Sequence, residues 1–464
     1  MQTTVAAIST PRGRGGIAVV RISGADTAAV LDRVFRAGSG MKTSERAPRT
    51  AAFGEITTPA GEVLDTGVAV FYKAPASYTG EDVAELSCHG GTAITEAVLS
   101  AVLEAGAAPA GRGEFTRRAF AAGKLTLSEA EAVGLLIDAD TESRRRFSSR
   151  AVRGGLSEKL DALCAPLAEV LIALWAAIDY PEEDVGESGL ENIAAVIAET
   201  RRGIASLLDT YKTGAAVVSG VRTVICGAPN VGKSALYNAL CGAERAIVTA
   251  IPGTTRDVLE DVVDFGGITL RLADTAGLHD TADEVEKIGI SRAEAAIRDA
   301  ELVFAVADTS LPEDELLASI RALGEAVADT GASVIGVFSK ADLAAEPSAA
   351  ARDALASFAA EVVSVSALQS GGLAELSAAV ARLYRSDLIP EADGAVLWDA
   401  RQKAALSRAD VILAEAEEAI ASGAPADALG VLAESALAEL RRTDGRGVSD
   451  EIVDGIFARF CVGK

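Results

Sequence analysis

Eight residues near the middle of the chain constrain its fold most strongly. The run from Gly227 to Ser234, GAPNVGKS, matches the pattern G-x-x-x-x-G-K-[ST], follows the apolar run VRTVIC and precedes the helical run SALYNAL. In such a loop glycines let backbone N–H groups face phosphate oxygens, Lys233 supplies a positive charge and Ser234 offers a hydroxyl to Mg²⁺. A chance glycine-rich turn is disfavoured by the strand and helix on either side. The run therefore predicts a phosphate-binding α/β domain.

Downstream motifs extend this prediction. Strand-like and helical runs alternate from Val221 to about Tyr384, which is typical of a mostly parallel sheet covered on both faces. The run DTAG, beginning at Asp274, ends the strand ITLRLAD, so its carboxylate is expected beside Mg²⁺ and the Gly277 amide beside the terminal phosphate. In the upstream run GTTRD, a threonine hydroxyl can complete the metal shell.

Two further loops bear on the choice of base. Ser339-Lys340-Ala341-Asp342 follows SVIGVF, and Ser366-Ala367-Leu368 follows VVSVS. Asp342 can accept hydrogen bonds from the ring N–H and the exocyclic amine of guanine, a pair that adenine does not offer, so GTP is the expected nucleotide. The usual motif is NKxD. With serine at 339, we expect selectivity to survive through Asp342 and affinity to fall by about 1 kcal/mol.

Catalysis needs a group that these motifs do not supply. Where many small GTPases carry a water-orienting glutamine, this chain carries Leu278, and the nearest candidates are His279 and Glu286. From the residues alone, Glu286 is better interpreted as part of a solvated helix face, paired with Lys287.

Length and patterning predict several domains. A chain of 464 residues should divide into about three. The N-terminal part mixes short β-rich runs with a helical stretch, and Ala/Leu/Glu-rich helices follow from Ser128, which with Glu131 forms an apparent capping box. Helical sequence resumes after Asp399. We predict an N-terminal α/β domain at 1–120, a discontinuous helical domain at 121–219 and 385–464, and an inserted α/β domain at 220–384.

Composition excludes several classes of protein. The formal net charge of −24 argues against broad adhesion to nucleic acid or anionic membrane. Five scattered cysteines without a CxxC pair indicate neither a disulfide framework nor a zinc site. No run has the length of a signal peptide core or a membrane span, so we expect a cytoplasmic protein and no membrane partner.

These features together resemble one family, the tRNA-modification GTPases MnmE (TrmE). The resemblance covers essentially the whole chain and includes PRGRGGIAVVRISG, YTGEDVAELSCHGG, GEFTRRAFAAGKLTLSEAEAVGLLIDADT, IPGTTRDVLEDVV, DTAGLHDTADEVEKIGI and the final CVGK. It implies an N-terminal tetrahydrofolate-binding domain, a discontinuous helical domain and an inserted Ras-like P-loop G domain.

The resemblance also implies partners and cofactors. Members form homodimers through their N-terminal domains and assemble with the flavoprotein MnmG (GidA), which holds FAD, into a heterotetramer or larger complex. The complex adds an aminomethyl or carboxymethylaminomethyl group to the wobble uridine of certain tRNAs. The chemistry uses GTP, K⁺, Mg²⁺ and methylene- or formyl-tetrahydrofolate.

Residue roles carry over by position. The resemblance implies that Lys233 and Glu286 are catalytic residues. In this role Glu286 positions the attacking water, which reverses its interpretation as part of a solvated helix face. Motifs and resemblance together predict nucleotide contacts from Asn230, Val231, Gly232, Lys233, Ser234, Ala235, Thr249, Ala250, Ile251, Pro252, Gly253, Thr254, Thr255, Asp274, Thr275, Ala276, Gly277, Ser339, Lys340, Asp342, Ser366 and Ala367. Implied metal ligands are Ser234 and Thr255 for Mg²⁺, and Asn230, Thr249, Ile251 and Thr254 for K⁺. Implied folate contacts are Arg21, Glu85, Lys124 and Lys464, with Cys461 as a candidate functional thiol.

Two other classes compete with this interpretation. A regulatory GTPase of ribosome assembly usually adds a basic RNA-binding module, whereas the C-terminal region here is helical and acidic. A membrane-remodelling GTPase would need a basic amphipathic helix or a lipidation signal. The loop PRGRGG either touches tRNA phosphate or is a flexible basic turn.

Overall fold

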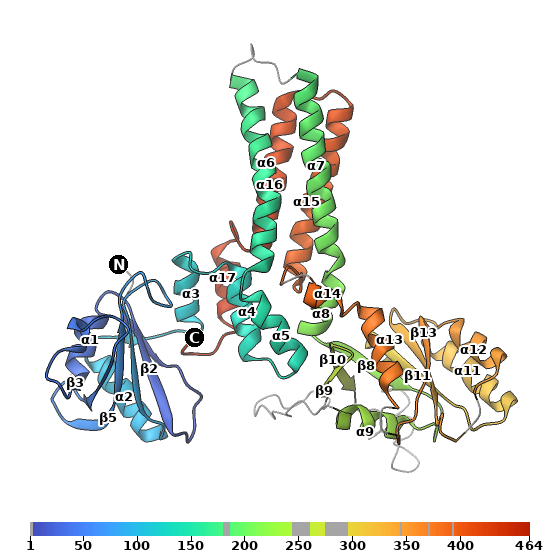
Figure 1. Cartoon of the computed structure of the whole chain (residues 1–464), viewed down its shortest axis with the longest axis horizontal. Coiled ribbons are helices and arrows are strands. Elements are labelled where there is room, and N and C mark those ends of the chain that lie inside the picture. The colour runs from blue at the N-terminus through green and yellow to red at the C-terminus, as the bar shows by residue number, and fades with distance from the viewer. Residues whose placement is uncertain are drawn as a thin grey trace. The chain divides into compact units, whose positions relative to one another are not determined.

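The computed structural model describes residues 3–179, 186–243, 260–273, 296–343, 346–369, 372–391 and 394–464 (Figure 1). The chain divides into two compact units. Unit 1 comprises Met1–Gly134 and Asp444–Lys464, and unit 2 comprises Leu135–Thr443. No helix in the described ranges is long and apolar enough to cross a membrane.

A mixed sheet forms the centre of unit 1. Among the described residues it has seven strands in the order β3-β4-β5-β6-β2-β1-β7, and neighbours run antiparallel except β1 and β7. The strands are β1 (Val5–Ile8), β2 (Ile17–Ser23), β3 (Phe35–Ala37), β4 (Ala51–Thr57), β5 (Val63–Tyr72), β6 (Val83–His89) and β7 (Ala108–Pro109).

Residues on one face of this sheet form the core of unit 1. Along β2, Ala18, Val20 and Ile22 are buried while the residues between them are more exposed, as the two-residue period of a strand requires. These side chains pack with the buried residues of α1 (Thr27–Val34) and α2 (Thr92–Glu104). The opposite face carries Arg21 of β2 and Glu85 of β6, which lie opposite one another in the ladder.

Short helices complete unit 1. They are η1 (Thr43–Glu45), α3 (Glu114–Ala121), α4 (Leu127–Ile137) and α17 (Asp450–Phe457). Leu127 and Ala130 of α4 pack with Phe457 and Phe460, which ties the C-terminal segment to the N-terminal part of the chain. Asp444–Lys464 thus belongs to unit 1, and the predicted assignment of this segment to the helical domain stays a prediction. The predicted boundaries at 120, 219 and 384 stay predictions.

The capping box predicted for α4 is displaced by two residues. Thr126, not Ser128, precedes the helix: the Thr126 N–H donates to the Glu129 carboxylate over 2.8 Å, and the Glu129 N–H donates to the Thr126 hydroxyl over 3.3 Å. Ser128 is buried in the first turn of α4. The prediction of a helix start here is confirmed, and the residues assigned to its cap were wrong.

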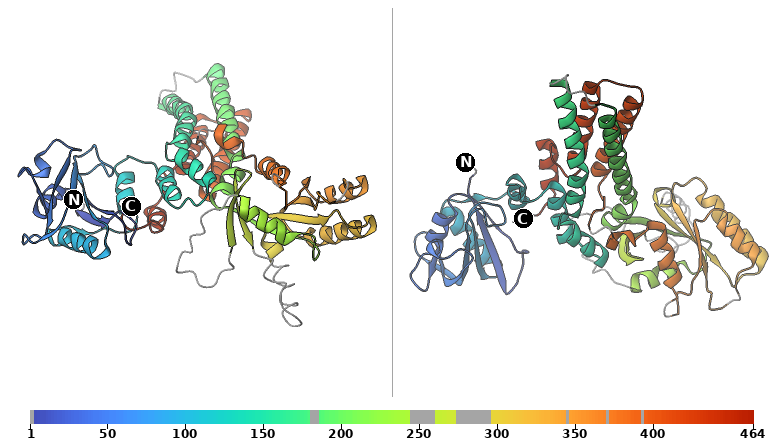
Figure 2. Two further views of the ribbon diagram at one scale, coloured as in Figure 1. Left: turned by 60° about the horizontal axis from the view of Figure 1, so that its bottom comes forward. Right: turned by 45° about the horizontal axis from the view of Figure 1, so that its top comes forward.

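Unit 2 contains a helical domain assembled from two stretches of sequence. Its helices are α5 (Glu142–Ala151), α6 (Gly155–Asp179), α7 (Gly186–Asp209), α8 (Tyr211–Val218), α14 (Leu388–Glu391), α15 (Ala400–Ala421) and α16 (Ala426–Thr443). Helices α6, α7, α15 and α16 lie side by side in Figures 1 and 2. On α15 the buried residues Leu406, Ala409, Leu413 and Ala416 recur every three or four positions, which gives one apolar stripe. This confirms the predicted discontinuous helical domain.

The rest of unit 2 is a covered sheet. Within the described residues its strands follow the order β13-β12-β11-β8-β10-β9, all parallel except the β9–β10 pair. They are β8 (Val221–Cys226), β9 (Glu260–Phe265), β10 (Ile268–Ala273), β11 (Leu302–Asp308), β12 (Ser333–Ser339) and β13 (Glu361–Ser364), with helices α9 (Lys233–Ala243), α11 (Glu313–Val327), α12 (Ala349–Ala356) and α13 (Ala374–Tyr384). Every residue of β11 is buried, in keeping with its apolar run from Leu302 to Ala307, and the strand ends at the buried Asp308.

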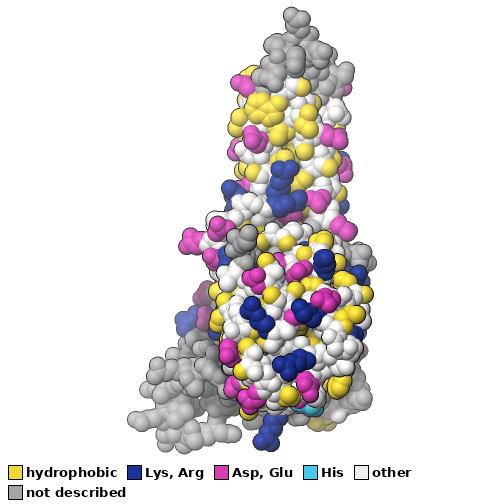
Figure 3. All heavy atoms as spheres, turned by 90° about the vertical axis from the view of Figure 1, so that its left-hand side faces the viewer, with side chains coloured by type: hydrophobic (Ala, Val, Ile, Leu, Met, Phe, Trp, Pro, Cys, Tyr) yellow, Lys and Arg dark blue, Asp and Glu magenta, His cyan; other side chains and the backbone are white. Residues whose placement is uncertain are grey.

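Charge is mixed on the face drawn in Figure 3. There, basic and acidic side chains are interspersed, with hydrophobic side chains between them. The large negative net charge therefore does not gather into one acidic surface on this face.

Candidate functional site

The phosphate loop, residues 227–234, joins β8 to α9. Asn230 and Gly232 both have left-handed backbone conformations, with φ of +63° and +99°. A Cβ at Gly227 would lie 2.6 Å from the carbonyl oxygen of Val306, so only glycine fits there without a shift of the backbone. The structure thus brings the predicted loop residues to the carboxyl end of β8 and the first turn of α9, with Ser234 and Asn230 exposed.

Lys233 lies inside the phosphate loop. Its Nζ donates hydrogen bonds of 2.9 Å to the carbonyl oxygen of Gly227 and 2.8 Å to that of Ala228. Burial lowers the pKa of Lys233 because a desolvated ammonium is destabilised. Burial likewise raises the pKa of the neighbouring Cys226 thiol. Among the described residues the Lys233 ammonium donates only to neutral carbonyl oxygens. This arrangement fits an anionic ligand, since phosphate oxygens would compensate the desolvation of the ammonium.

The first guanine loop, Ser339–Asp342, lies beside the phosphate loop. Ser339 is 5% exposed, and its hydroxyl donates to the carbonyl oxygen of Val231 over 2.6 Å. Lys340 has a left-handed φ of +58°, and its Nζ forms an ion pair of 2.5 Å with Asp308 at the end of β11. Burial alone raises the pKa of Asp308, but hydrogen bonds from Lys340 and Ser310 outweigh burial and the net pKa is lowered. Asp342 itself is exposed, as a residue that meets a ligand can be.

The second guanine loop, Ser366–Leu368, is adjacent to the first. The Ala341 N–H donates to the carbonyl oxygen of Val365 over 3.2 Å, which links the two loops. Ser366 is 5% exposed, yet its hydroxyl has no hydrogen-bond partner among the described residues. An orphaned buried hydroxyl at this point fits a base-binding pocket, because a ligand would supply its missing partner.

The remaining predicted nucleotide and metal residues lie outside the described residues. These are Thr249, Ala250, Ile251, Pro252, Gly253, Thr254, Thr255, Asp274, Thr275, Ala276, Gly277 and Glu286. The structure therefore brings together the phosphate loop and the two guanine loops. The predicted roles of all these residues stay predictions.

A second polar site lies on the open face of the sheet in unit 1. The Arg21 guanidinium donates to one oxygen of Glu85 from Nε over 3.0 Å and from Nη2 over 2.8 Å. The guanidinium carbon also lies 5.5 Å from the ring centroids of both Tyr78 and Phe115. The Tyr72 hydroxyl is 3.5 Å from the other Glu85 oxygen, and burial followed by the charge of Glu85 raises the pKa of Tyr72. The ion pair is thus surrounded by aromatic rings.

The C-terminal run CVGK is built into this site through its backbone. The Phe115 N–H donates to the carbonyl oxygen of Lys464 over 2.9 Å, and the Gly113 N–H donates to that of Cys461 over 3.2 Å. The Ser9 hydroxyl donates to the carbonyl oxygen of Gly463 over 2.9 Å. Cys461 is an exposed free cysteine.

Lys124 approaches the same region from another side. Its Nζ donates to the carbonyl oxygen of Pro75, at the start of the loop that carries Tyr78. The structure therefore brings Arg21 and Glu85 into direct contact, and it links Lys464 and Lys124 to segments that carry the surrounding rings. The sequence did not single out Tyr72, Tyr78 or Phe115, although Tyr78 lies in the run YTGED and Phe115 in GEFTRR.

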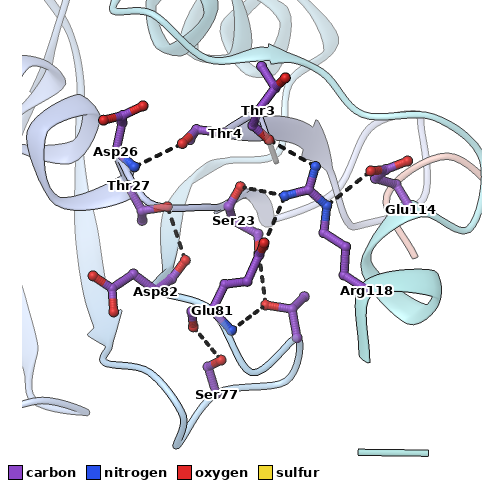
Figure 4. Close-up of polar contacts among 11 residues, drawn as sticks. Thr3, Thr4, Ser23, Asp26, Thr27, Ser77, Glu81, Asp82, Glu114 and Arg118 are labelled. Carbon is purple, nitrogen blue, oxygen red and sulfur yellow. Dashed lines mark hydrogen bonds and ion pairs between the residues drawn. The ribbon is translucent and has the colours of Figure 1, made fainter. Parts of the chain in front are cut away.

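A buried arginine holds these segments in place (Figure 4). Arg118 of α3 is 6% exposed, and it donates to the carboxylates of Glu81 over 2.9 Å and Glu114 over 3.0 Å. It also donates to the carbonyl oxygens of Thr3 over 2.9 Å and Ser23 over 3.4 Å. The network connects α3, which contains Phe115, with the loop before β6. Arg118 too was missed from sequence, because its partners are far apart along the chain.

Comparison with known proteins identifies the family. The family model described as GTP-binding protein TrmE N-terminus matches residues 4–124, and that described as MnmE helical domain matches residues 127–461. Relatives named tRNA modification GTPase MnmE are 40% identical in Symbiobacterium thermophilum and 38% identical in Geobacter sulfurreducens, each match covering 100% of both chains. A solved GTP-binding protein from Sulfolobus solfataricus in complex with GDP is 15% identical with a TM-score of 0.27, covering 49% of this chain and 67% of that one, which is too low to bear on the fold. The chain belongs to the MnmE family of tRNA modification GTPases, and it is a GTP hydrolase.

Proposed function

We propose that this GTPase is potassium-dependent and acts with the FAD-containing flavoprotein MnmG. Together they add a carboxymethylaminomethyl or aminomethyl group to the wobble uridine of certain tRNAs, drawing on a one-carbon tetrahydrofolate. The observation that carries the proposal is the arrangement in unit 1. There, an Arg21–Glu85 pair lies under two aromatic rings, and the backbone of the C-terminal CVGK run closes around one of them.

The residues of unit 1 fit a reduced folate. A pterin presents an edge of N–H donors that a carboxylate such as Glu85 can accept, and its flat ring suits stacking on an aromatic side chain. The glutamate tail of folate is anionic. The Lys124 ammonium contacts the carbonyl oxygen of Pro75 in this region, and the backbone of Lys464 contacts that of Phe115, so both lysines are candidates to bind the tail. A bound folate supplies the one-carbon unit. The chain's own residues bind and orient it.

The residues of unit 2 fit GTP with Mg²⁺. Lys233 gains a charged partner in the outer phosphates, and Ser234 at the first turn of α9 is exposed for a metal-bound hydroxyl. Asp342 is exposed, and the Ser366 hydroxyl has no hydrogen-bond partner in the part of the chain that the structure describes, so both can bind a base. We assign Asp342 to the guanine edge and Thr255 to the second Mg²⁺ position.

Potassium dependence rests on the resemblance and on one described residue. Asn230 is exposed in a left-handed turn of the phosphate loop, and its amide oxygen is a chemically suitable ligand for a cation. Thr249, Ile251 and Thr254 would complete the shell, with Glu286 positioning water in place of a glutamine. A bound K⁺ supplies the positive charge that phosphoryl transfer needs. Replacing K⁺ by Na⁺ should slow the wild-type enzyme, and Glu286→Ala should bind GTP yet hydrolyse it poorly. Equal rates in the two salts would refute the potassium requirement.

The assembly is proposed on the same grounds. We infer a homodimer joined through the N-terminal domains, acting in the cytoplasm with MnmG on tRNA. Because the net charge is −24, tRNA should be held mainly by the flavoprotein or by a local basic patch such as the one containing Arg12 and Arg14.

Nucleoside analysis of tRNA tests the function as a whole. Cells lacking this protein should contain unmodified wobble uridine, and the wild-type gene should restore the modification. Arg21→Ala should fail to restore it while retaining GTPase activity, whereas Lys233→Ala should lose both. An unchanged wobble uridine together with disturbed ribosome assembly would instead favour a ribosome-assembly GTPase.

A further inference from the structure

The hydroxyl of Ser339 joins the first guanine loop to the phosphate loop. Ser339 Oγ is 2.6 Å from the carbonyl oxygen of Val231 and 3.2 Å from that of Ala307. A hydroxyl has one proton, so the shorter contact, with Val231, takes the hydrogen bond. Among the described residues the side chain is 5% exposed, so water does not compete for this bond.

The accepting carbonyl lies at the tightest point of the phosphate loop. Val231 stands between Asn230 and Gly232, both with positive φ. Glycine adopts positive φ freely and asparagine does so at a modest cost, so the Ser339 hydrogen bond adds a contact that holds Val231 between them. Val231 is itself buried, so loss of the Ser339 proton would leave its carbonyl oxygen without this partner in a site that excludes water.

Because the Ser339 hydroxyl has a single proton, it has no further hydrogen bond to donate to a base. An asparagine amide has two N–H donors, so one can hold the loop while the other meets an acceptor on guanine. Serine has no second donor. Guanine presents acceptors at N7 and O6, and neither can receive a hydrogen bond from a hydroxyl whose proton is already committed.

We propose that Ser339 is a positioning residue for the phosphate loop and makes no hydrogen bond to guanine. The inference rests on the proposed nucleotide site. Base recognition then falls to Asp342 and to the second guanine loop, whose Ser366 hydroxyl is unused among the described residues. The substitution of serine for the usual asparagine thus separates two roles: it keeps the contact with the phosphate loop and gives up the donor to the base.

Binding of two nucleotides to four forms of the full-length protein tests this. GDP is compared with 7-deaza-GDP, in which a C–H group replaces the N7 acceptor. The forms are wild type, Ser339→Ala, Ser339→Asn and Ser357→Ala. The last removes an exposed serine hydroxyl that bonds only to its own helix, so it controls for the loss of a hydroxyl.

The expected results differ between the forms. Wild type should bind GDP and 7-deaza-GDP equally, and Ser339→Ala should weaken both by about 5- to 10-fold. Ser339→Asn should bind GDP more tightly than wild type, by about 5-fold for one added neutral hydrogen bond. It should bind 7-deaza-GDP more weakly than GDP, because its second donor then meets N7. Ser357→Ala should behave as wild type. Circular dichroism checks folding of each form. If Ser339→Ala does not fold, two variants replace it: Ser339→Thr, which keeps the hydroxyl, and Ser339→Cys, whose thiol is a poor hydrogen-bond donor.

Several outcomes would overturn the inference. Ser339→Ala with unchanged GDP affinity would remove the positioning role. A wild-type preference for GDP over 7-deaza-GDP that vanishes in Ser339→Ala would show that Ser339 reads the base. If wild type binds no GDP at all, it is the proposed nucleotide site that fails, so the two failures are distinguishable.

Discussion

The backbone N–H of Phe115 donates a hydrogen bond of 2.9 Å to the carbonyl oxygen of Lys464, so the residue whose ring lies beside Arg21 is held by the C-terminal run. Gly463 makes this approach possible. It has a φ of +97°, and a Cβ there would lie 2.0 Å from the carbonyl oxygen of Ile8. No residue other than glycine fits this position without displacing the run.

The first prediction concerns this glycine. Gly463→Ala should displace CVGK from Phe115 and weaken binding of 5-formyltetrahydrofolate by 10-fold or more, on the order of 1.4 kcal/mol. Isothermal titration calorimetry on the full-length protein measures the affinity. GTP hydrolysis should be unchanged, because unit 2 contains the nucleotide motifs.

A second glycine provides the matched control. Gly455 lies within α17 in the same C-terminal segment, and a Cβ there would meet nothing within 4 Å. Gly455→Ala should therefore leave folate affinity unchanged and stabilise the helix by about 0.5–1 kcal/mol. Equal folate affinity in both variants would contradict the role assigned to the C-terminal run.

The second prediction compares two adjacent arginines of α3. Arg118→Met leaves the carboxylates of Glu81 and Glu114 without their buried cation, which should destabilise unit 1 by about 3–5 kcal/mol. Arg117 forms its ion pair with Asp454 at the surface, where both side chains are about half exposed. Arg117→Met should therefore cost at most about 1 kcal/mol. Scanning calorimetry of the full-length protein measures both, and similar melting temperatures would refute the claim that the buried network holds the site.

The sequence predicts best those strands that are buried on both faces. LVFAVAD and SVIGVFS coincide with β11 and β12 because a parallel strand covered on both sides has a nearly continuous apolar sequence. VRTVIC likewise coincides with β8, in which the exposed Arg222 is followed by three buried residues. Strand β4, AAFGEIT, is not predicted. Its large residue Phe53 is exposed, while the small Ala52 and Gly54 face inward, the reverse of the usual pattern.

Gly54 shows why small residues are needed there. A Cβ at this position would lie 2.1 Å from the carbonyl oxygen of Arg36 on the adjacent β3. A glycine inside a strand suggests a break when only the sequence is considered, whereas here it permits close approach of a neighbouring backbone.

The misplaced cap of α4 has a local cause. The run TLSEAE contains two overlapping S/T-x-x-E patterns, Thr126 with Glu129 and Ser128 with Glu131. Both satisfy the capping rule, and burial of Ser128 and Leu127 in unit 1 decides between them. Sequence alone lacks that information.

The candidate sites also differ in how much of each can be predicted from the sequence. Contiguous motifs such as the phosphate loop are visible in the sequence because their residues are neighbours in the chain. The surroundings of Arg21 come from Tyr78 and Phe115, which lie in separate segments and meet only in the folded sheet. Ser339 was noted only as a departure from NKxD, and its contact with Val231 requires the packing of β12 against the phosphate loop.

The third prediction concerns the choice of base. Asp342→Asn replaces the acceptor for the ring N–H and exocyclic amine of guanine by an amide. GDP affinity should fall by about 100-fold or more, since two charge-assisted hydrogen bonds are lost. Xanthosine diphosphate carries an oxygen in place of the amine, so its affinity should rise in the variant. Competition with a fluorescent nucleotide measures both. Parallel losses of GDP and xanthosine diphosphate would mean that Asp342 does not read the base.

The fourth prediction is a proton uptake linked to Lys233. Burial holds the pKa of Lys233 below its ordinary value of 10.5. Phosphate oxygens stabilise the ammonium, so the pKa should rise when GDP binds. Between the lowered and the raised pKa, binding must therefore take up a proton, and affinity should decrease as pH increases through that window.

Calorimetry in buffers of different ionisation enthalpy measures this uptake directly. Well below the lowered pKa, Lys233 is protonated in both states, so the binding heat should not depend on the buffer through this residue. As the pH is raised through the window between the lowered and the raised pKa, the heat should vary with the buffer in the sense of proton uptake. Lys233→Arg keeps a permanent positive charge, so any binding it retains should lack this dependence. If the binding heat of the wild type does not depend on the buffer at any pH in this window, Lys233 has the same protonation state before and after binding. That result would contradict the prediction that phosphate raises the pKa of this lysine, which is desolvated where it donates to the carbonyl oxygens of Gly227 and Ala228.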